Sequence, residues 1–220
     1  SMEWRQSFIK TYLERDIPQF DMRIPAETLR RLWIMLAHSQ GQFLTISKLA
    51  GNLGINGQTI IRYIDLLQDL FLIRKLQPWY SNVGKRLVKS PKVYVRDSGI
   101  LHSLLNIPNL DNLLSNPIVG KSWEGFVIDN LLSFLPIGAE TYFYRSARGA
   151  EIDLIIKHPD QRVLAIEIKR SSVPSLERGF YEACNDVNPT HKYVVYDGKD
   201  SFPLRGGVTA VSLQELLEIL

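Results

Sequence analysis

The sequence predicts an α+β protein, in which a helical unit with a winged helix precedes an α/β unit. Three observations support this prediction. Apolar residues recur at every third or fourth position as far as Leu70, which is typical of amphipathic helices. The last two of these helices are joined at Gly54 and followed by two strand-like segments, which is the order of a winged helix. From Ile118 onward the patterns run helix, three strands, helix and strand, which is an α/β layer plan.

Four helices are predicted ahead of the first strand, at about residues 3–20, 25–39, 45–51 and 56–70. The first has a single apolar stripe along its length. Pro25 suits the first turn of the second helix, because proline lacks the N–H group that a first turn leaves unpaired. Gly51 and Gly54 are suited to end the third helix. The third and fourth helices together therefore predict a helix-turn-helix.

The segment that follows is basic, since between Phe71 and Arg96 it contains cations and neither Asp nor Glu. The cations are Arg74, Lys75, Lys85, Arg86, Lys89, Lys92 and Arg96. Strands at residues 71–76 and 91–95 make this segment the predicted wing. Because basic side chains contact phosphates, we expect DNA contact through Lys85, Arg86 and Lys89 of the wing and through Gln58 and Arg62 of the preceding helix. A solvated basic loop and a winged helix that connects proteins are the alternatives.

Composition sets further bounds, although the net charge of +3 says little about partners. The single cysteine, Cys184, excludes an internal disulfide, and fits a reducing cytoplasmic setting and a buried side chain. No apolar run approaches the roughly 20 residues of a membrane span, and the chain does not start like a signal peptide, so we expect no membrane partner. Gly120-Lys121-Ser122 resembles the end of a phosphate-binding loop. No nucleotide site is expected there, because Ser115 stands where the first glycine belongs.

Two apolar strands carry acids where a strand inside a sheet ordinarily has none. They are predicted at residues 151–157 and 162–169. Buried carboxylates are costly unless they are paired or bind a metal, and oxygen ligands suit Mg²⁺. A carboxylate-bound Mg²⁺ activates water for phosphodiester hydrolysis. We therefore expect Asp153 and Glu167 to bind Mg²⁺, with Glu124 joining them from the preceding helix. Lys169, on the strand face of Glu167, is expected to orient the water or neutralise developing charge.

The same residues have a simpler interpretation. Asp153, Glu167 and Lys169 also fit a buried ion-pair network without turnover. Glu124 also fits an acid that the helix dipole favours near a helix start. Arg145 and Arg148, in the hairpin before the acids, are candidates for phosphate contact. Whether the chain is an enzyme, a magnesium-dependent nuclease, stays open on the residues alone.

At these positions the sequence resembles the PD-(D/E)XK nuclease superfamily. Asp153 matches the first acid of the motif and Glu167-Ile168-Lys169 matches its second half. Glu124, within Trp123-Glu124-Gly125-Phe126-Val127, matches the helix-borne acid of many members. No proline precedes Asp153, a position that the superfamily keeps only loosely. The resemblance implies a restriction-endonuclease-like α/β fold with Glu124, Asp153, Glu167 and Lys169 as catalytic residues and the three acids as metal ligands.

Nearly the whole chain resembles the C-terminal portion of a bacterial and archaeal group of AAA+ type ATPases that ends in a domain of unknown function. The segments that carry this resemblance are Tyr12–Ile17, Lys92–Ile100, Trp123–Val127, Gly149–Asp153 and Ala165–Ser171. It implies a helical remnant after a missing ATPase core at 1–24, a winged helix at 25–96 and a nuclease-like domain at 97–220. The implied function is a DNA-associated part of an ATPase with magnesium-dependent phosphodiester hydrolysis. The alternative is a non-catalytic module of that ATPase that binds DNA or protein.

Overall fold

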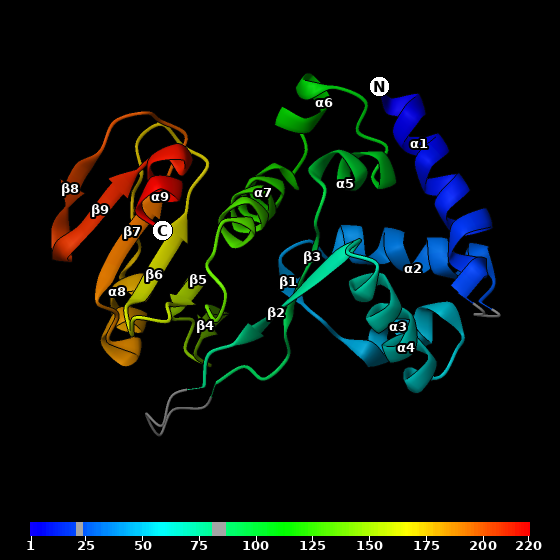
Figure 1. The fold of residues 1–220 in the computed structure, drawn as a ribbon, viewed down its shortest axis with the longest axis horizontal. Coiled ribbons are helices and arrows are strands. Elements are labelled where there is room, and N and C mark those ends of the chain that lie inside the picture. Colours follow the sequence, from blue (N-terminus) through cyan, green and yellow to red (C-terminus); the bar gives the residue numbers. More distant parts are fainter. Residues whose placement is uncertain (21–23, 81–86) are drawn as a thin grey trace. The chain divides into compact units, whose positions relative to one another are not determined.

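A computed structural model describes residues 1–20, 24–80 and 87–220. The chain forms two compact units (Figure 1). The first comprises Ser1–Lys75 and Val93–Gly125, and the second comprises Leu76–Lys92 and Phe126–Leu220. The chain therefore enters the second unit, returns to the first, and then completes the second.

The first unit is mainly helical. Its helices are α1 (Met2–Thr11), α2 (Ala26–His38), α3 (Ile46–Leu53), α4 (Gly57–Asp69), α5 (Ser98–Leu104), α6 (Leu110–Leu114) and the start of α7 (Val119–Ser133). The predicted helix over residues 3–20 changes geometry, because a π-helical turn at Tyr12–Asp16 and a 3-10 turn at Ile17–Phe20 follow α1. Leu13 and Ile17 stay buried through this change, so the apolar stripe is kept.

The predicted helix-turn-helix is confirmed by α3 and α4. Gly54 ends α3 with a φ of 65°, a left-handed conformation that suits glycine. Asn56 begins α4, where its side chain accepts a 2.8 Å hydrogen bond from the backbone N–H of Thr59. The helix buries Ile60 and Ile64 in the core around Trp33 of α2. Residues 81–86 of the predicted wing lie outside the described residues.

In the first unit, short strands adjoin the helices in the order β1 (Gln42–Phe43), β3 (Lys92–Val95) and the start of β2 (Ile73–Pro78). Strand β2 begins two residues later than predicted, because Phe71 turns the chain with a φ of 58°. The buried side-chain amide of Gln40 forms two hydrogen bonds with the backbone of Val95 on β3. Its Oε1 accepts the N–H of Val95 at 2.7 Å, and its Nε2 donates to the Val95 carbonyl at 3.3 Å.

Helix α5 begins directly after Asp97. The Asp97 side chain accepts the backbone N–H of Ile100 at 2.7 Å and caps this helix. Helix α5 then buries Ile100, Leu101 and Leu104. A turn containing Pro108 separates α5 from α6.

His102 of α5 gives the first unit a pH-sensitive contact. Its Nε2 lies 2.8 Å from the Ser122 hydroxyl, and burial lowers the pKa of His102 below its usual 6.5. Since the folded state favours the neutral ring, this stabilisation is present above pH 6.5 and is lost as the pH falls through the lowered pKa. We expect His102→Gln, which cannot titrate, to reduce the acid dependence of the unfolding free energy in urea titrations. An unchanged pH profile would contradict this.

The second unit is built on a mixed sheet in the order β2-β4-β5-β6-β7-β9-β8. Its strands after β2 are β4 (Glu140–Arg145), β5 (Glu151–Lys157), β6 (Val163–Ile168), β7 (His191–Val195), β8 (Phe202–Leu204) and β9 (Val208–Val211). The β4-β5-β6 and β8-β9 neighbours are antiparallel, whereas β2-β4, β6-β7 and β7-β9 are parallel. The part of α7 from Phe126 onward and helices α8 (Arg178–Val187) and α9 (Leu213–Ile219) complete the unit (Figure 1).

Helix α8 packs on the centre of this sheet. Its Phe180, Ala183 and Cys184 form one apolar core with residues of the strands, among them Ile152 and Ala165. Cys184 is buried as predicted, and burial raises the pKa of its thiol to about 12. It is therefore a core residue without thiolate reactivity at neutral pH.

The predicted fold class is confirmed, because helices dominate the first part of the chain and a mixed α/β arrangement the second. The order α7, β4, β5, β6, α8, β7 is the predicted helix, three strands, helix and strand. The short strands β1 and β8 were not predicted. Both are too short to show an alternating pattern.

Candidate functional site: a buried cluster of acids and lysines

Asp153 and Glu167 lie on the neighbouring strands β5 and β6 and are both buried, at 7% and 9% exposure. The pairing of β4 with β5 shifts between Tyr142 and Tyr144, so a β-bulge falls on the part of β5 that contains Asp153. The carboxylate of Asp153 accepts the backbone N–H of Ile168 at 3.1 Å. Asp153 thus binds a main-chain group at the end of β6 instead of pointing to solvent.

Lys92, at the start of β3, contacts two acids of β5 and is only 1% exposed. Its Nζ lies 2.8 Å from Oε1 of Glu151 and 3.6 Å from Oδ1 of Asp153. It also lies 5.4 Å from the ring centre of Phe143, within the range of a cation–π contact. The sequence placed Lys92 among the cations of a wing. Its burial could have been inferred from its position in Lys92–Val95, an otherwise apolar segment that forms a strand with all four residues buried.

The other cations of the cluster come from β4 and from the end of β6. Lys169 Nζ lies 2.9 Å from Oε1 of Glu167, as the shared strand face predicted. Burial lowers the pKa of Lys169, but the pair with Glu167 and the nearby charge of Asp153 outweigh it and raise the pKa. Arg145 pairs with Glu151. Among the described residues of the second unit, this cluster therefore sets three carboxylates against three cations.

Glu124 belongs to the first unit, in the part of α7 that precedes Phe126. It is 4% exposed and accepts a 2.7 Å hydrogen bond from the hydroxyl of Tyr94. It also forms an ion pair with Lys121, one turn earlier on the helix. Lys121 and Ser122 of the sequence that resembles a phosphate-binding loop thus lie within α7, where Ser122 contacts His102.

The arrangement does not fit Mg²⁺ as it stands. Asp153, Glu151 and Glu167 offer the oxygen donors that Mg²⁺ prefers. Their charge is already balanced by the cations of the cluster, and Lys92 lies between Glu151 and Asp153. Across the described parts of the chain, no group of three or more His, Cys, Asp or Glu side chains is placed to hold a metal ion. The cations would have to be displaced before Mg²⁺ could bind. Magnesium binding and the catalytic roles of Glu124, Asp153, Glu167 and Lys169 are not tested by this geometry and stay predictions.

The residues expected to contact DNA are spread over both units. Gln58 and Arg62 are exposed on α4, beside Asp65, which pairs with Lys75 at 2.7 Å. Lys89 is exposed in the second unit. Lys85 and Arg86 lie outside the described residues.

The two wing residues just before Lys89 pair with the end of β4 and with the residue after it. Leu87 bridges Ser146, and the N–H of Val88 donates to the Arg145 carbonyl at 3.1 Å. Lys89 therefore directly follows the residues that pair with Arg145 and Ser146, and the exposed Arg148 lies in the turn from β4 to β5. Both cations are exposed, one in the predicted wing and one in the predicted hairpin.

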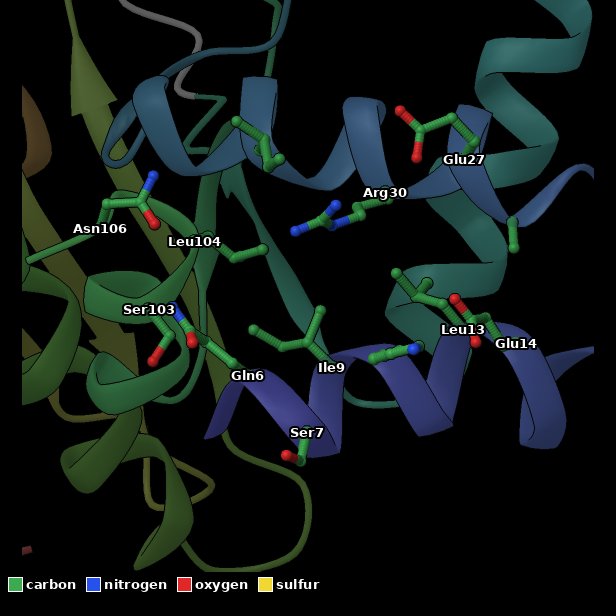
Figure 2. A pocket seen from close by; sticks show the side chains of 13 residues that line it. Gln6, Ser7, Ile9, Leu13, Glu14, Glu27, Arg30, Ser103, Leu104 and Asn106 are labelled. Atoms are coloured by element: carbon green, nitrogen blue, oxygen red, sulfur yellow. The ribbon is translucent and has the colours of Figure 1, made fainter. Parts of the chain in front are cut away.

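A cavity of the first unit contains none of the predicted site residues. It has a volume of about 720 Å³ and is lined by α1, α2 and α5. Figure 2 shows that Ile9, Leu13 and Leu104 contribute apolar side chains to the lining, and that Arg30 of α2 points into the cavity. Its polar residues carry both signs of charge, so it does not define a ligand class.

The fold and the cluster define a class of protein that joins a helix-turn-helix unit to a mixed α/β unit, in which Asp153, Glu167 and Lys92 are buried. Residues 1–111 match a family described as Domain of unknown function (DUF8612), and the chain belongs to this family. Residues 119–216 match a second family description, Domain of unknown function (DUF4143).

Similar proteins occur in bacteria and archaea. Uncharacterized protein Rv2008c of Mycobacterium tuberculosis and uncharacterized protein Mb2031c of Mycobacterium bovis are each 42% identical over 217 residues, which cover 99% of this chain and 49% of the relative. Uncharacterized protein MJ1637 of Methanocaldococcus jannaschii is 26% identical over 170 residues, or 74% of this chain and 35% of its own length. The chain thus spans about half the length of the mycobacterial relatives. No solved structure matches it. In the described part of the chain, no helix has the length and apolar character to cross a membrane.

Proposed function

We propose that this chain is the DNA-binding, non-hydrolysing part of a larger ATPase. The observation that carries the proposal is the pairing of each motif acid with a cation of the protein itself. Asp153 contacts Lys92, Glu167 contacts Lys169 and Glu124 contacts Lys121. A magnesium-dependent nuclease instead needs carboxylates that are available to the metal. The neutral cluster therefore supports the interpretation as a structural ion-pair network.

DNA is the proposed partner because exposed cations lie next to this cluster. Lys89 and Arg148 flank the end of β4, and both are exposed. With the neighbouring acids neutralised, phosphates that approach these cations meet no uncompensated carboxylate from the cluster. On α4, by contrast, Arg62 shares the outer face with Asp65 and Asp69, which weakens the attraction to phosphate there.

The ATPase is proposed from the resemblance of nearly the whole chain to the C-terminal portion of AAA+ type ATPases. The mycobacterial relatives are about twice as long as the aligned segment, which leaves room for such a domain. The activity of that longer protein, and its coupling to DNA binding, are part of the proposal.

The proposal is tested with double-stranded DNA in fluorescence anisotropy at increasing salt. We expect salt-dependent binding, and we expect Lys89→Ala with Arg148→Ala to lower the slope of log K against log salt by about 2, or about 1 for each phosphate that the variant no longer binds. Lys199→Ala with Arg205→Ala removes two exposed cations near β8, at the other end of the strand order, and serves as the matched control. Equal effects of the two double variants would contradict the proposed surface.

The absence of hydrolysis is tested separately with supercoiled plasmid and Mg²⁺ or Mn²⁺. The plasmid is expected to stay intact. Nicking that disappears in the Asp153→Ala variant would overturn this part of the proposal and would support the magnesium-dependent nuclease instead.

A further inference from the structure

Lys92 places a positive charge between the buried carboxylate of Asp153 and the partly buried carboxylate of Glu151. Its ammonium group lies 2.8 Å from Glu151 and 3.6 Å from Asp153, and the side chain is almost fully enclosed. A lysine is rarely buried unless it is paired, because transfer of its charge out of water is costly. The two carboxylates supply that pairing.

A divalent ion bound between these two acids would need the space that the ammonium group takes. Mg²⁺ binds carboxylate oxygens at about 2.1 Å and keeps several of its waters. The ammonium group already occupies the space between Oε1 of Glu151 and Oδ1 of Asp153, so lysine and metal cannot be present together. The lysine has little room to leave, since the ring of Phe143, 5.4 Å from its ammonium group, is itself fully buried.

We infer that Lys92 is a built-in cation that excludes divalent metal from the acids of β5, and that its truncation converts Glu151 and Asp153 into a site for Mg²⁺ or Mn²⁺. In the Lys92→Ala variant the removed side chain leaves space for an ion and its waters. The two carboxylates then lose the cation that they share, while Arg145 keeps its pair with Glu151. The excess negative charge favours capture of a cation from solution. This extends the proposed absence of hydrolysis, but it is tested without DNA, so the two can fail independently.

The experiment compares the melting temperature of the unaltered protein and of Lys92→Ala in EDTA and in millimolar Mg²⁺ or Mn²⁺. We expect no metal-dependent shift in the unaltered protein. For Lys92→Ala we expect a lower melting temperature in EDTA and a rise of roughly 5 °C or more when the metal reaches about 100 times its Kd. Mn²⁺ titration followed by electron paramagnetic resonance is expected to show one bound ion in the variant.

Two further variants make the result specific. Adding Asp153→Asn to Lys92→Ala is expected to remove the bound Mn²⁺. Lys75→Ala removes a half-buried lysine from a pair with a single acid, Asp65, and is expected to gain no metal. Stoichiometric Mn²⁺ binding by the unaltered protein would overturn the inference. A Lys92→Ala variant whose melting temperature does not change with metal would also overturn it. The same holds for a variant that does not fold when refolded with Mg²⁺ or Mn²⁺.

Discussion

Replacing Lys92 with methionine is expected to lower the free energy of unfolding by about 3–5 kcal/mol, the usual effect of breaking a buried ion pair by removing one partner. Methionine keeps most of the side-chain volume but leaves Glu151 and Asp153 without the ammonium group that lies between them. Urea unfolding without divalent metal, followed by circular dichroism, measures this loss.

The matched control is Lys157→Met on β5 of the same unit. Lys157 pairs with Glu140 at 2.8 Å, but both side chains are more than a third exposed. Exposed pairs contribute at most about 1 kcal/mol, so this variant is expected to change stability little. In a double-mutant cycle, Glu151→Gln is expected to reduce the cost of Lys92→Met. Equal costs for Lys92→Met and Lys157→Met would show that the buried cluster is not an ion-pair network.

Gly125→Ala is the second change with a large expected effect, although it adds only one methyl group. A Cβ atom at this position of α7 would lie 2.4 Å from Nε2 of Gln40. Gln40 would have to move and release the backbone N–H and carbonyl of Val95, which it holds on β3. Each buried group left unpaired costs about 1–3 kcal/mol, so a fall in melting temperature of several degrees is expected.

Gly120→Ala, on the same helix, is the control. Among the described residues, and apart from the chain neighbours and backbone of its own helix, no atom lies within 4 Å of a Cβ added there. Alanine in place of glycine at an unstrained helical position ordinarily stabilises by about 0.4–1 kcal/mol, because it restricts the unfolded chain. The two substitutions are therefore expected to have opposite signs in thermal unfolding. Tolerance of Gly125→Ala would mean that Gln40 can release Val95 at no cost.

Much of the fold could be predicted because its patterns are local. The run Leu154-Ile155-Ile156 predicts a buried strand wherever it pairs, and the apolar spacing in α2 predicts which face packs on the core. Glycine at position 54 and asparagine at position 56 mark the turn of the helix-turn-helix by their own conformational preferences. Such signals need no knowledge of distant parts of the chain.

The chemistry of the cluster could be predicted only in part. That Glu167 and Lys169 meet follows from the strand repeat, because they are two residues apart. That Lys92 meets Asp153 depends on contacts between segments far apart in sequence, which spacing does not encode. Counting the cations along the sequence groups Lys92 with the basic wing. In the structure it is buried in an otherwise apolar strand and serves as a counter-ion for the acids. The bulge near Asp153 likewise depends on how β4 and β5 pair.

The end of the sheet at β8 bears on how the protein behaves in concentrated solution. This terminal strand has only three residues, and the middle one is Pro203, which has no N–H group to offer. A strand of another molecule therefore finds a short and incomplete row of hydrogen-bonding groups along β8. Natural sheets use short, proline-containing edges in this way to resist edge-to-edge aggregation.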